Sequence, residues 1–167
     1  KNIPLVFFQD VTGFMVGSKA EHGGIIKDGA KLVNAVANSV VPKFTIIVGH
    51  SFGAGNYAMC GKAYDPRLIV AWPTAKIAVM GGDQAAKVLL QIEKSRSKEL
   101  SAEDEKTMLA SIHKKYKKHM SPYYAASQMW VDSVIDPADT RSVISQGIEA
   151  ANNAPIQRPY NPGILQT

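Results

Sequence analysis

Short apolar runs constrain the fold of this chain more than any other feature of its sequence. They cover residues 3–8 and 43–49, and two further runs lie on either side of Pro73 within residues 68–82. Their Val, Ile and Phe content is typical of buried strands. Segments with helical spacing separate and follow them, and no internal linker or repeat interrupts the series. Alternating strands and helices predict an α/β fold in one domain.

The segment between the first two strands has the spacing of an amphipathic helix. Its apolar stripe consists of Ile26, Ala30, Val33, Ala37 and Val40. Pro42 ends this helix because proline cannot continue the hydrogen-bond pattern. A second, short helix rich in small residues is expected to start near Ala54.

The C-terminal part of the chain predicts four further helices. They begin at Gly82 and Ser101, cover residues 123–131, and run from about residue 141 to 151. Ser101 with Asp104 three residues later forms a capping signal, and an apolar line follows through Met108, Ile112 and Tyr116. Residues 156–167 are expected to be an extended tail. Because the chain begins at Lys1 inside a strand-like run, we expect it to be a fragment of a longer protein.

Composition excludes several classes of function. The formal charge of +5 comes largely from the lysines of residues 113–119, which solvate the end of a helix and accompany no nucleic-acid-binding motif. No apolar run is long enough for a membrane span. Cys60 is the single cysteine, so no internal disulfide or zinc knuckle can form, and its apolar surroundings predict a packed thiol. We therefore expect no nucleic acid, no membrane and no metal.

The stretch "FTIIVGHSFGAGNY" contains G-x-S-x-G between a strand and a helix, the setting of a hydrolase nucleophile at Ser51. A triad also needs an acid and a histidine after the serine. The only later histidines, His113 and His119, lie in the lysine-rich helix. His50 is adjacent to Ser51, but neighbours on a strand point to opposite faces. The sequence therefore disfavours a serine hydrolase.

The backbone of the same stretch offers different chemistry. Gly53 and the small residues after it allow a tight turn into a helix, whose first N–H groups have no partner inside the helix. Such amides stabilise an oxygen that gains negative charge during a reaction. The alternative is that these glycines only let the strand and helix pack closely. Glycines in "TGFMVG" and "AVMGGDQAA" follow the other strands in the same way.

Five blocks of sequence together resemble one family of enzymes. They are "IPLVFFQDVTGFMVG", "GGIIKDGAKLVNAVA", "VPKFTIIVGHSFGAGNYAMCGKAYDPR", "WPTAKIAVMGGDQAAKVL" and "DSVIDPADTR". In this order they are similar to the C-terminal domain of biotin-dependent acyl-CoA carboxyltransferase β subunits. Within the family, "GAGNYAMCGKAY" is most similar to methylcrotonoyl-CoA carboxylase β chains. Residues 157–167 and His50 depart from the usual pattern.

The resemblance implies a crotonase (ClpP-like) fold, a spiral of ββα units, with residues 1–167 as the C-terminal carboxyltransferase domain. It implies that CO2 passes from carboxybiotin, held on a carrier domain, to a coenzyme A thioester. By motif, the backbone N–H groups of Ala54 and Gly55 would form the oxyanion hole for the biotin ureido oxygen. Gly13, Phe14 and Gly53 would line the same cleft. Tyr57 would lie near the acyl group, although core packing explains it equally well.

The resemblance also implies partners. These are the N-terminal domain of a neighbouring β subunit, an α subunit carrying biotin carboxylase and biotin, and further β subunits in a dimer or hexamer. The compartment would be the bacterial cytoplasm or the mitochondrial matrix. Two alternatives stay open. One is a carboxyltransferase subunit of the glutaconyl-CoA decarboxylase type, and the other is a fragment that serves only in assembly.

Overall fold

A computed structural model describes residues 2–96, 102–154 and 159 of the chain. The strands are β1 (Leu5–Val11), β2 (Lys43–Phe52), β3 (Leu68–Ala71), β4 (Lys76–Ala78) and β5 (Ser133–Val134). The helices are α1 (Ser18–His22), α2 (Ile25–Asn38), α3 (Gly53–Ala58), α4 (Gly82–Arg96), α5 (Ala102–His119), α6 (Pro122–Ser127) and α7 (Thr140–Asn152). Short 3-10 turns cover Lys62–Tyr64 and Pro137–Asp139. The predicted α/β class is confirmed.

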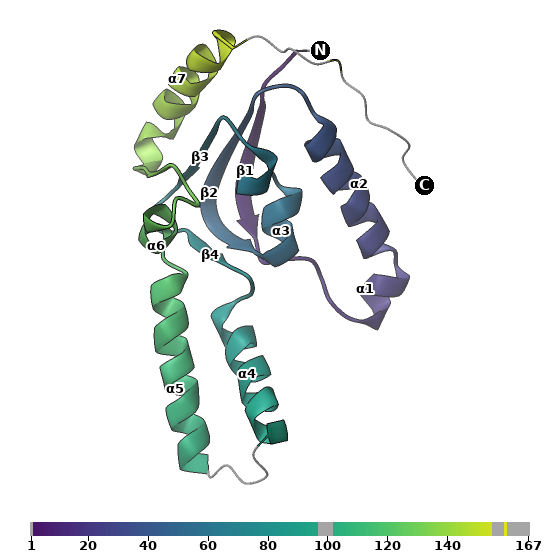
Figure 1. Cartoon of the computed structure of the whole chain (residues 1–167), viewed down its shortest axis with the longest axis vertical. Coiled ribbons are helices and arrows are strands. Elements are labelled where there is room, and N and C mark those ends of the chain that lie inside the picture. Colours follow the sequence, from purple (N-terminus) through teal and green to yellow (C-terminus); the bar gives the residue numbers. More distant parts are fainter. Residues whose placement is uncertain (1, 97–101, 155–158, 160–167) are drawn as a thin grey trace.

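The strands form one parallel sheet in the order β1-β2-β3-β5, and β4 also pairs with β2 (Figure 1). The first half of β2 pairs with β3, whereas its last residues, His50 to Phe52, pair with β4. The long central strand therefore contacts three neighbours. Its carboxyl end leads directly into α3, which places the glycine-rich turn at the edge of the sheet.

Helices pack on both faces of β2, which explains its unbroken apolar sequence. On one face Gly147 of α7 lies against the ring of Phe44, where a Cβ on the glycine would be 2.9 Å from Cε1. The indole nitrogen of Trp72 donates to the hydroxyl of Thr140 at the start of α7 (2.9 Å). On the other face, Thr45 donates to the Cys60 carbonyl just after α3 (2.7 Å).

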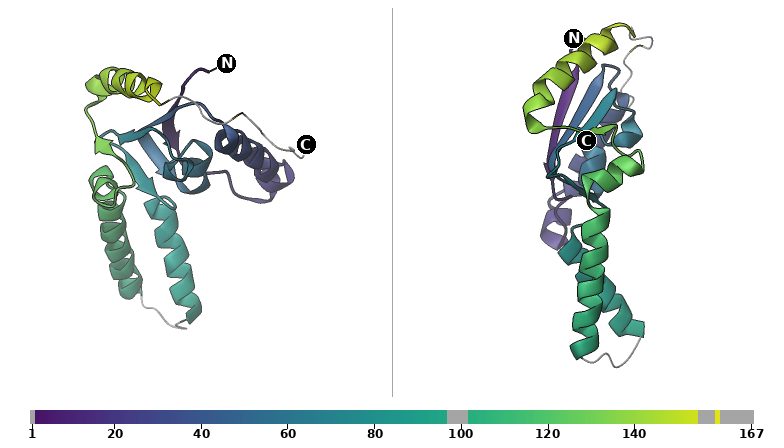
Figure 2. Two further views of the ribbon diagram at one scale, coloured as in Figure 1. Left: turned by 45° about the horizontal axis from the view of Figure 1, so that its top comes forward. Right: turned by 90° about the vertical axis from the view of Figure 1, so that its left-hand side faces the viewer.

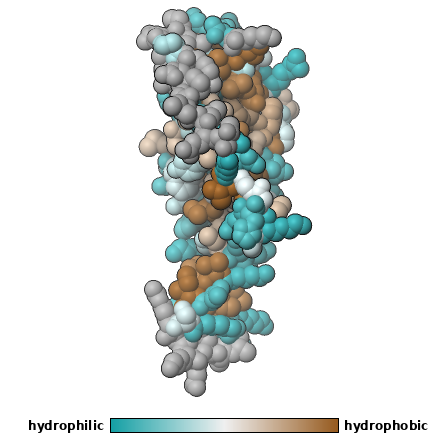
Figure 3. All heavy atoms as spheres, turned by 90° about the vertical axis from the view of Figure 1, so that its right-hand side faces the viewer, coloured by the Kyte–Doolittle hydropathy of each residue, from teal (hydrophilic) through white to brown (hydrophobic). Residues whose placement is uncertain are grey.

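Helices α4 and α5 form a hairpin that projects from the sheet (Figures 1 and 2). Apolar side chains gather on the surface of the hairpin region (Figure 3), and α4 contributes the half-exposed Val88, Leu89 and Ile92. The predicted helices from Gly82 and after Ser101 are confirmed, but the Ser101 cap lies outside the described residues, as does the tail from residue 160. None of the described helices is long and apolar enough to cross a membrane.

Two helix predictions need correction. In α2 the buried residues are Gly29 and Val36, whereas Ile26 of the expected stripe is 66% exposed. The inward face is rotated because the ring of Phe14 packs against Gly29, where any Cβ would clash with it. The helix expected over residues 123–131 ends at Ser127, since Met129 adopts a left-handed backbone (φ 58°) that stops it.

Candidate functional site

The first turn of α3 has backbone N–H groups with no acceptor inside the helix. Phe52 occupies the cap position and makes no side-chain hydrogen bond to the helix. The first N–H groups of a helix have no acceptor within it, so α3 itself offers none to the N–H groups of Gly53, Ala54 and Gly55, and of these residues Ala54 is exposed. Gly53 has φ +54°, and a Cβ there would lie 2.8 Å from the Val79 carbonyl oxygen. Only glycine fits this turn.

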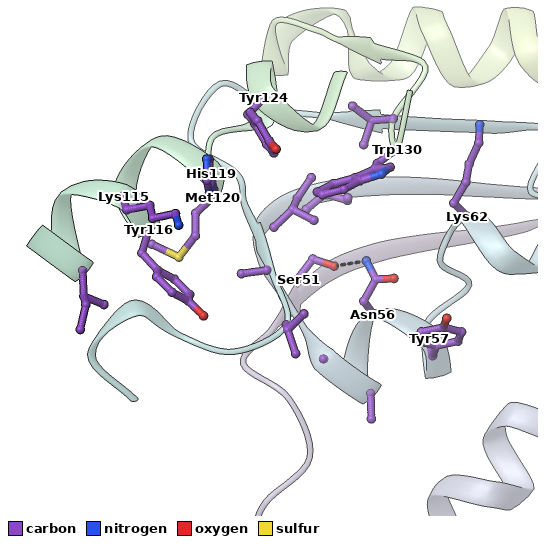
Figure 4. A pocket seen from close by; sticks show the side chains of 18 of the residues that line it. Ser51, Asn56, Tyr57, Lys62, Lys115, Tyr116, His119, Met120, Tyr124 and Trp130 are labelled. Atoms are coloured by element: carbon purple, nitrogen blue, oxygen red, sulfur yellow. Dashed lines mark hydrogen bonds between the residues drawn. The ribbon is translucent and has the colours of Figure 1, made fainter. Parts of the chain in front are cut away.

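A cavity of about 1220 Å³ opens beside this turn. Its walls come from the end of β2, α3, β4, the α4–α5 hairpin and the segment around α6. Figure 4 shows Tyr116 from α5 and Met120, which directly follows α5, on one side of the view and Asn56 and Tyr57 from α3 on the other. Most of the lining is apolar, which favours exclusion of water and strengthens polar contacts to the amides.

Three predicted site residues, Gly53, Ala54 and Tyr57, line this cavity. Ala54 and Tyr57 are exposed, and Gly53 is half-buried. Gly55 is buried instead: a Cβ on it would lie 2.6 Å from Cγ2 of Val11 and 3.3 Å from the Cα of Gly13. Gly55 therefore packs α3 against the end of β1.

Gly13 and Phe14 lie on a second, smaller cavity of about 800 Å³, between the end of β1 and α2. Gly13 and Phe14 therefore do not line the same cavity as Gly53, Ala54 and Tyr57, although the resemblance had led us to expect one shared cleft. The reason is the close contact of Gly55 with Val11 and Gly13, which places α3 between them and the larger cavity. Sequence spacing does not reveal such packing.

Ser51 is not an activated nucleophile. Its side chain is fully buried beneath the larger cavity, donates to Oε1 of Gln9 (2.6 Å) and accepts from Nδ2 of Asn56 (2.6 Å). The neighbouring His50 points to the other face of the sheet, as strand geometry predicts. Among the described residues no imidazole contacts the Ser51 hydroxyl, so the hydrolase alternative has no triad.

The structure pairs Asp10 with His50, a contact that no sequence pattern predicts. Pairing of β1 and β2 jumps from Gln9–Ile47 to Val11–Ser51, so Asp10 stands opposite the bulged residues of β2. Its Oδ1 accepts from the His50 backbone N–H (2.8 Å) and lies 2.9 Å from His50 Nδ1. The backbone N–H first, and then the imidazole, lower the pKa of Asp10 below its ordinary value.

His50→Ala is expected to leave the Asp10 pKa below its ordinary value, because alanine retains the backbone N–H that is the largest cause of the lowering. With a lowered folded-state pKa, the contact stabilises the fold above the ordinary Asp pKa, and this contribution is lost as pH falls through the folded value. A carboxyl NMR titration measures both proteins. An unshifted Asp10 midpoint in the wild type would contradict the assignment.

Cys60 is the packed thiol that the sequence predicts. Its side chain is fully buried, and burial raises the pKa of the thiol. At pH 7–8 it stays protonated and inaccessible, so we expect no reaction of native protein with dithionitrobenzoate and one equivalent reacting in guanidinium chloride. Rapid reaction of the folded protein would show that the thiol is exposed.

Sequence reasoning did not identify the far wall of the cavity. His119 stacks on Tyr124 with ring centroids 4.7 Å apart, and Tyr124 meets Trp130 edge-on at 5.8 Å. All three line the cavity, and His119 is exposed there. At the rim, Lys62 forms an ion pair with Asp132 (2.7 Å).

The apolar line of Met108, Ile112 and Tyr116 was the one sequence pattern that could have indicated this wall, since its residues line the same cavity.

The parallel strands end in glycine turns beside an apolar cavity, which fits the predicted carboxyltransferase class. Comparison with known proteins supports the same class. A family model described as the carboxyl transferase domain matches residues 1–162. The chain therefore belongs to the carboxyl transferase domain family.

The chain is 52% identical over 163 residues to the methylcrotonoyl-CoA carboxylase beta chain of Dictyostelium discoideum, covering 95% of this chain and 28% of that protein. It is 46% identical over 165 residues to the biotin-dependent 3-methylcrotonyl-coenzyme A carboxylase beta1 subunit of Mycobacterium tuberculosis, covering 95% and 31%. The beta subunit of geranyl-CoA carboxylase from P. aeruginosa superposes with a TM-score of 0.85 at 38% identity, covering 99% and 32%.

These matches confirm the predicted family and the crotonase-like fold. The chain spans less than a third of the length of each of these relatives. Relatives occur both in mitochondria and in bacteria.

Proposed function

We propose that this domain is the part of an acyl-CoA carboxylase that carries out carboxyl transfer, with Ala54 and Gly55 donating backbone N–H groups to the ureido oxygen of biotin. The observation that carries the proposal is the uncapped first turn of α3, with Ala54 exposed on the wall of the large cavity. Carboxybiotin supplies the carboxyl group and, after CO2 leaves, a basic nitrogen that takes the substrate proton.

The amides stabilise the negative charge that develops on the ureido oxygen. Because they belong to a turn fixed by Gly53, they need no reorganisation during the reaction, and one such donor contributes about 3 kcal/mol. On this proposal no side chain of the site acts as the general base. The exposed Ala54 methyl is small enough to let a planar ring approach the backbone.

The cavity fits the bicyclic head of biotin and an acyl chain in size and polarity. Apolar residues from β4, α4 and α5 surround it, including Ile77, Leu89 and Ile112, and they limit access of water that would hydrolyse the reacting species. Tyr57 lies on the same wall as Ala54, where its ring would contact the acyl group. The Gly13 and Phe14 cavity is a candidate for a more distant part of either ligand.

The acyl-CoA proposed is 3-methylcrotonoyl-CoA, because the most similar relatives reported above are methylcrotonoyl-CoA carboxylases. The geranyl-CoA carboxylase neighbour makes a longer branched acyl group the natural competitor. We propose assembly with an N-terminal domain of a neighbouring β subunit and with a biotin-carrying α subunit. Such a complex would be a dimer or hexamer of β subunits; the transcarboxylase 12S structure, which shares a TM-score of 0.85, is described as a hexamer assembly.

The test uses a β chain of the relatives' full length, assembled with its α subunit. Carboxylation of methylcrotonoyl-, geranyl- and propionyl-CoA is compared with biotin free or on its carrier. We expect methylcrotonoyl-CoA to give the highest kcat/KM and residues 1–167 alone to have little activity. No transfer to any of the three thioesters by the assembled complex would refute the proposal.

A further inference from the structure

We propose that Gln9, Ser51 and Asn56 form a buried hydrogen-bond relay that positions α3, and with it the amides of Ala54 and Gly55, against the large cavity. This inference rests on the proposed function, because the relay matters for catalysis only if those amides bind the reacting oxygen. It gives a role to the Ser51 hydroxyl of the G-x-S-x-G motif, which the reaction itself does not use.

The relay joins two strands to the middle and the C-terminal end of α3. Asn56 in α3 donates to the Ser51 hydroxyl in β2, and Ser51 donates to Oε1 of Gln9 in β1, each at 2.6 Å (Figure 4 shows the first of these bonds). Nε2 of Gln9 then returns to α3. It donates to the carbonyl of Met59 at 2.7 Å and, more weakly, to that of Asn56 at 3.4 Å.

The relay is placed where hydrogen bonds are most effective. Gln9 and Ser51 are both 0% exposed, and within the described residues no buried side-chain nitrogen or oxygen is left without a partner. Removing one member would leave a polar group of the fully buried Gln9 or Ser51 unsatisfied, which is costlier than losing a surface contact.

Helix α3 needs such support because of its length. Six residues are too few for a helix to be stable by itself, so its direction is set by what holds its ends. Gln9 holds the Met59 carbonyl, and Thr45 holds the carbonyl of Cys60. Asn56 directly follows the proposed amide donors, so a shift at Asn56 moves them as well. A displacement of about 1 Å in a reacting geometry can cost on the order of 100-fold in rate.

Gln9→Glu tests the relay within a single protein, because it can be switched by pH. When protonated, the new carboxyl group can still donate to the Met59 carbonyl and accept from Ser51. When ionised, it has no donor and places negative charge beside a carbonyl oxygen 2.7 Å from the original nitrogen. Burial and this contact raise its pKa, so the relay is intact at low pH and broken as pH rises.

We expect kcat for carboxyl transfer in the Gln9→Glu complex to fall at least tenfold, relative to wild type, as pH rises from about 6 to 9. The KM for acyl-CoA should change less than about threefold, because the relay acts on the amides and not on substrate uptake. Hydrogen exchange of the peptide covering α3, corrected for intrinsic rates, should become faster over the same pH range. Asp10→Asn, next in the strand but outside the relay, is the matched control and should follow wild type in both measurements.

Ser51→Ala is the second variant and removes both central bonds without adding charge. It should lower kcat by about 10- to 100-fold at every pH, with faster exchange in α3. If both variants match Asp10→Asn in kcat and in exchange while Ala54→Pro abolishes transfer, the relay proposal is overturned and the proposed function stands. If Ala54→Pro also transfers normally, the amide assignment itself is wrong. Loss of exchange protection across the whole chain, rather than in α3, would likewise overturn a positioning role.

Discussion

Replacing Ala54 by proline is expected to lower kcat for carboxyl transfer by about 100- to 1000-fold, the loss typical of removing one oxyanion donor. Proline deletes the N–H at this position but is tolerated in the first turn of a helix, where that N–H has no partner in the helix. Ala54 is exposed on the cavity wall, so the ring displaces no core side chain. The KM for acyl-CoA should stay within about threefold of wild type, because the lost bond forms mainly in the transition state.

Ala54→Gly is the control because it changes the same side chain, by removing the methyl group, while keeping the backbone N–H. Both variants are measured in the assembled full-length complex, with carrier-bound biotin as donor and thermal unfolding recorded alongside. Gly55 is less suitable for this purpose: any Cβ at that position would collide with Val11, so lost activity would not distinguish a missing donor from misplaced packing. Wild-type turnover by a folded Ala54→Pro enzyme would remove the amide of Ala54 from the mechanism.

Phe44→Ala is expected to lower the free energy of unfolding by about 3–5 kcal/mol. The Phe44 ring is 1% exposed and lies between the sheet and α7, in contact with Gly147. Truncation removes its buried area and leaves a cavity that Gly147, having no side chain, cannot fill. The docking of α7 depends on this contact and on the bond from Trp72 to Thr140, so α7 should lose protection first.

Phe8→Ala provides the matched comparison, since Phe8 is on the neighbouring strand but 51% exposed. We expect its cost to be well below that of Phe44→Ala in urea unfolding experiments, in line with the smaller area removed from water. Equal losses for the two variants would mean that Phe44 is not part of the core that the structure describes.

The G-x-S-x-G stretch illustrates how a local motif can have two chemical meanings. In a hydrolase the serine hydroxyl would face solvent and an imidazole. Here the same spacing buries the hydroxyl of Ser51 between Gln9 and Asn56 and exposes the main chain at Ala54. The absence of a suitable later histidine was enough to disfavour the hydrolase, but it did not indicate what the buried hydroxyl does instead.

The sequence by itself determined strands β1 to β4, most of the helices and the glycine turn, because apolar periodicity and backbone freedom belong to contiguous residues, whereas the short elements α1 and β5 were not predicted. The runs at residues 3–8 and 43–49 became β1 and β2, and the turn at Gly53 was required by its positive φ. The resemblance of five sequence blocks to a known family, rather than periodicity, identified the family and placed Ala54 and Tyr57 as candidate site residues.

Only the tertiary structure decided which distant residues meet. The bulge between β1 and β2 brings Asp10 to His50, 40 residues away, and places Gln9 under α3. The hairpin supplies Tyr116 to a cavity whose opposite wall is Tyr57. Such contacts depend on strand register and on the angle at which helices dock. Both are set by packing summed over the whole core, so no short stretch of residues contains them.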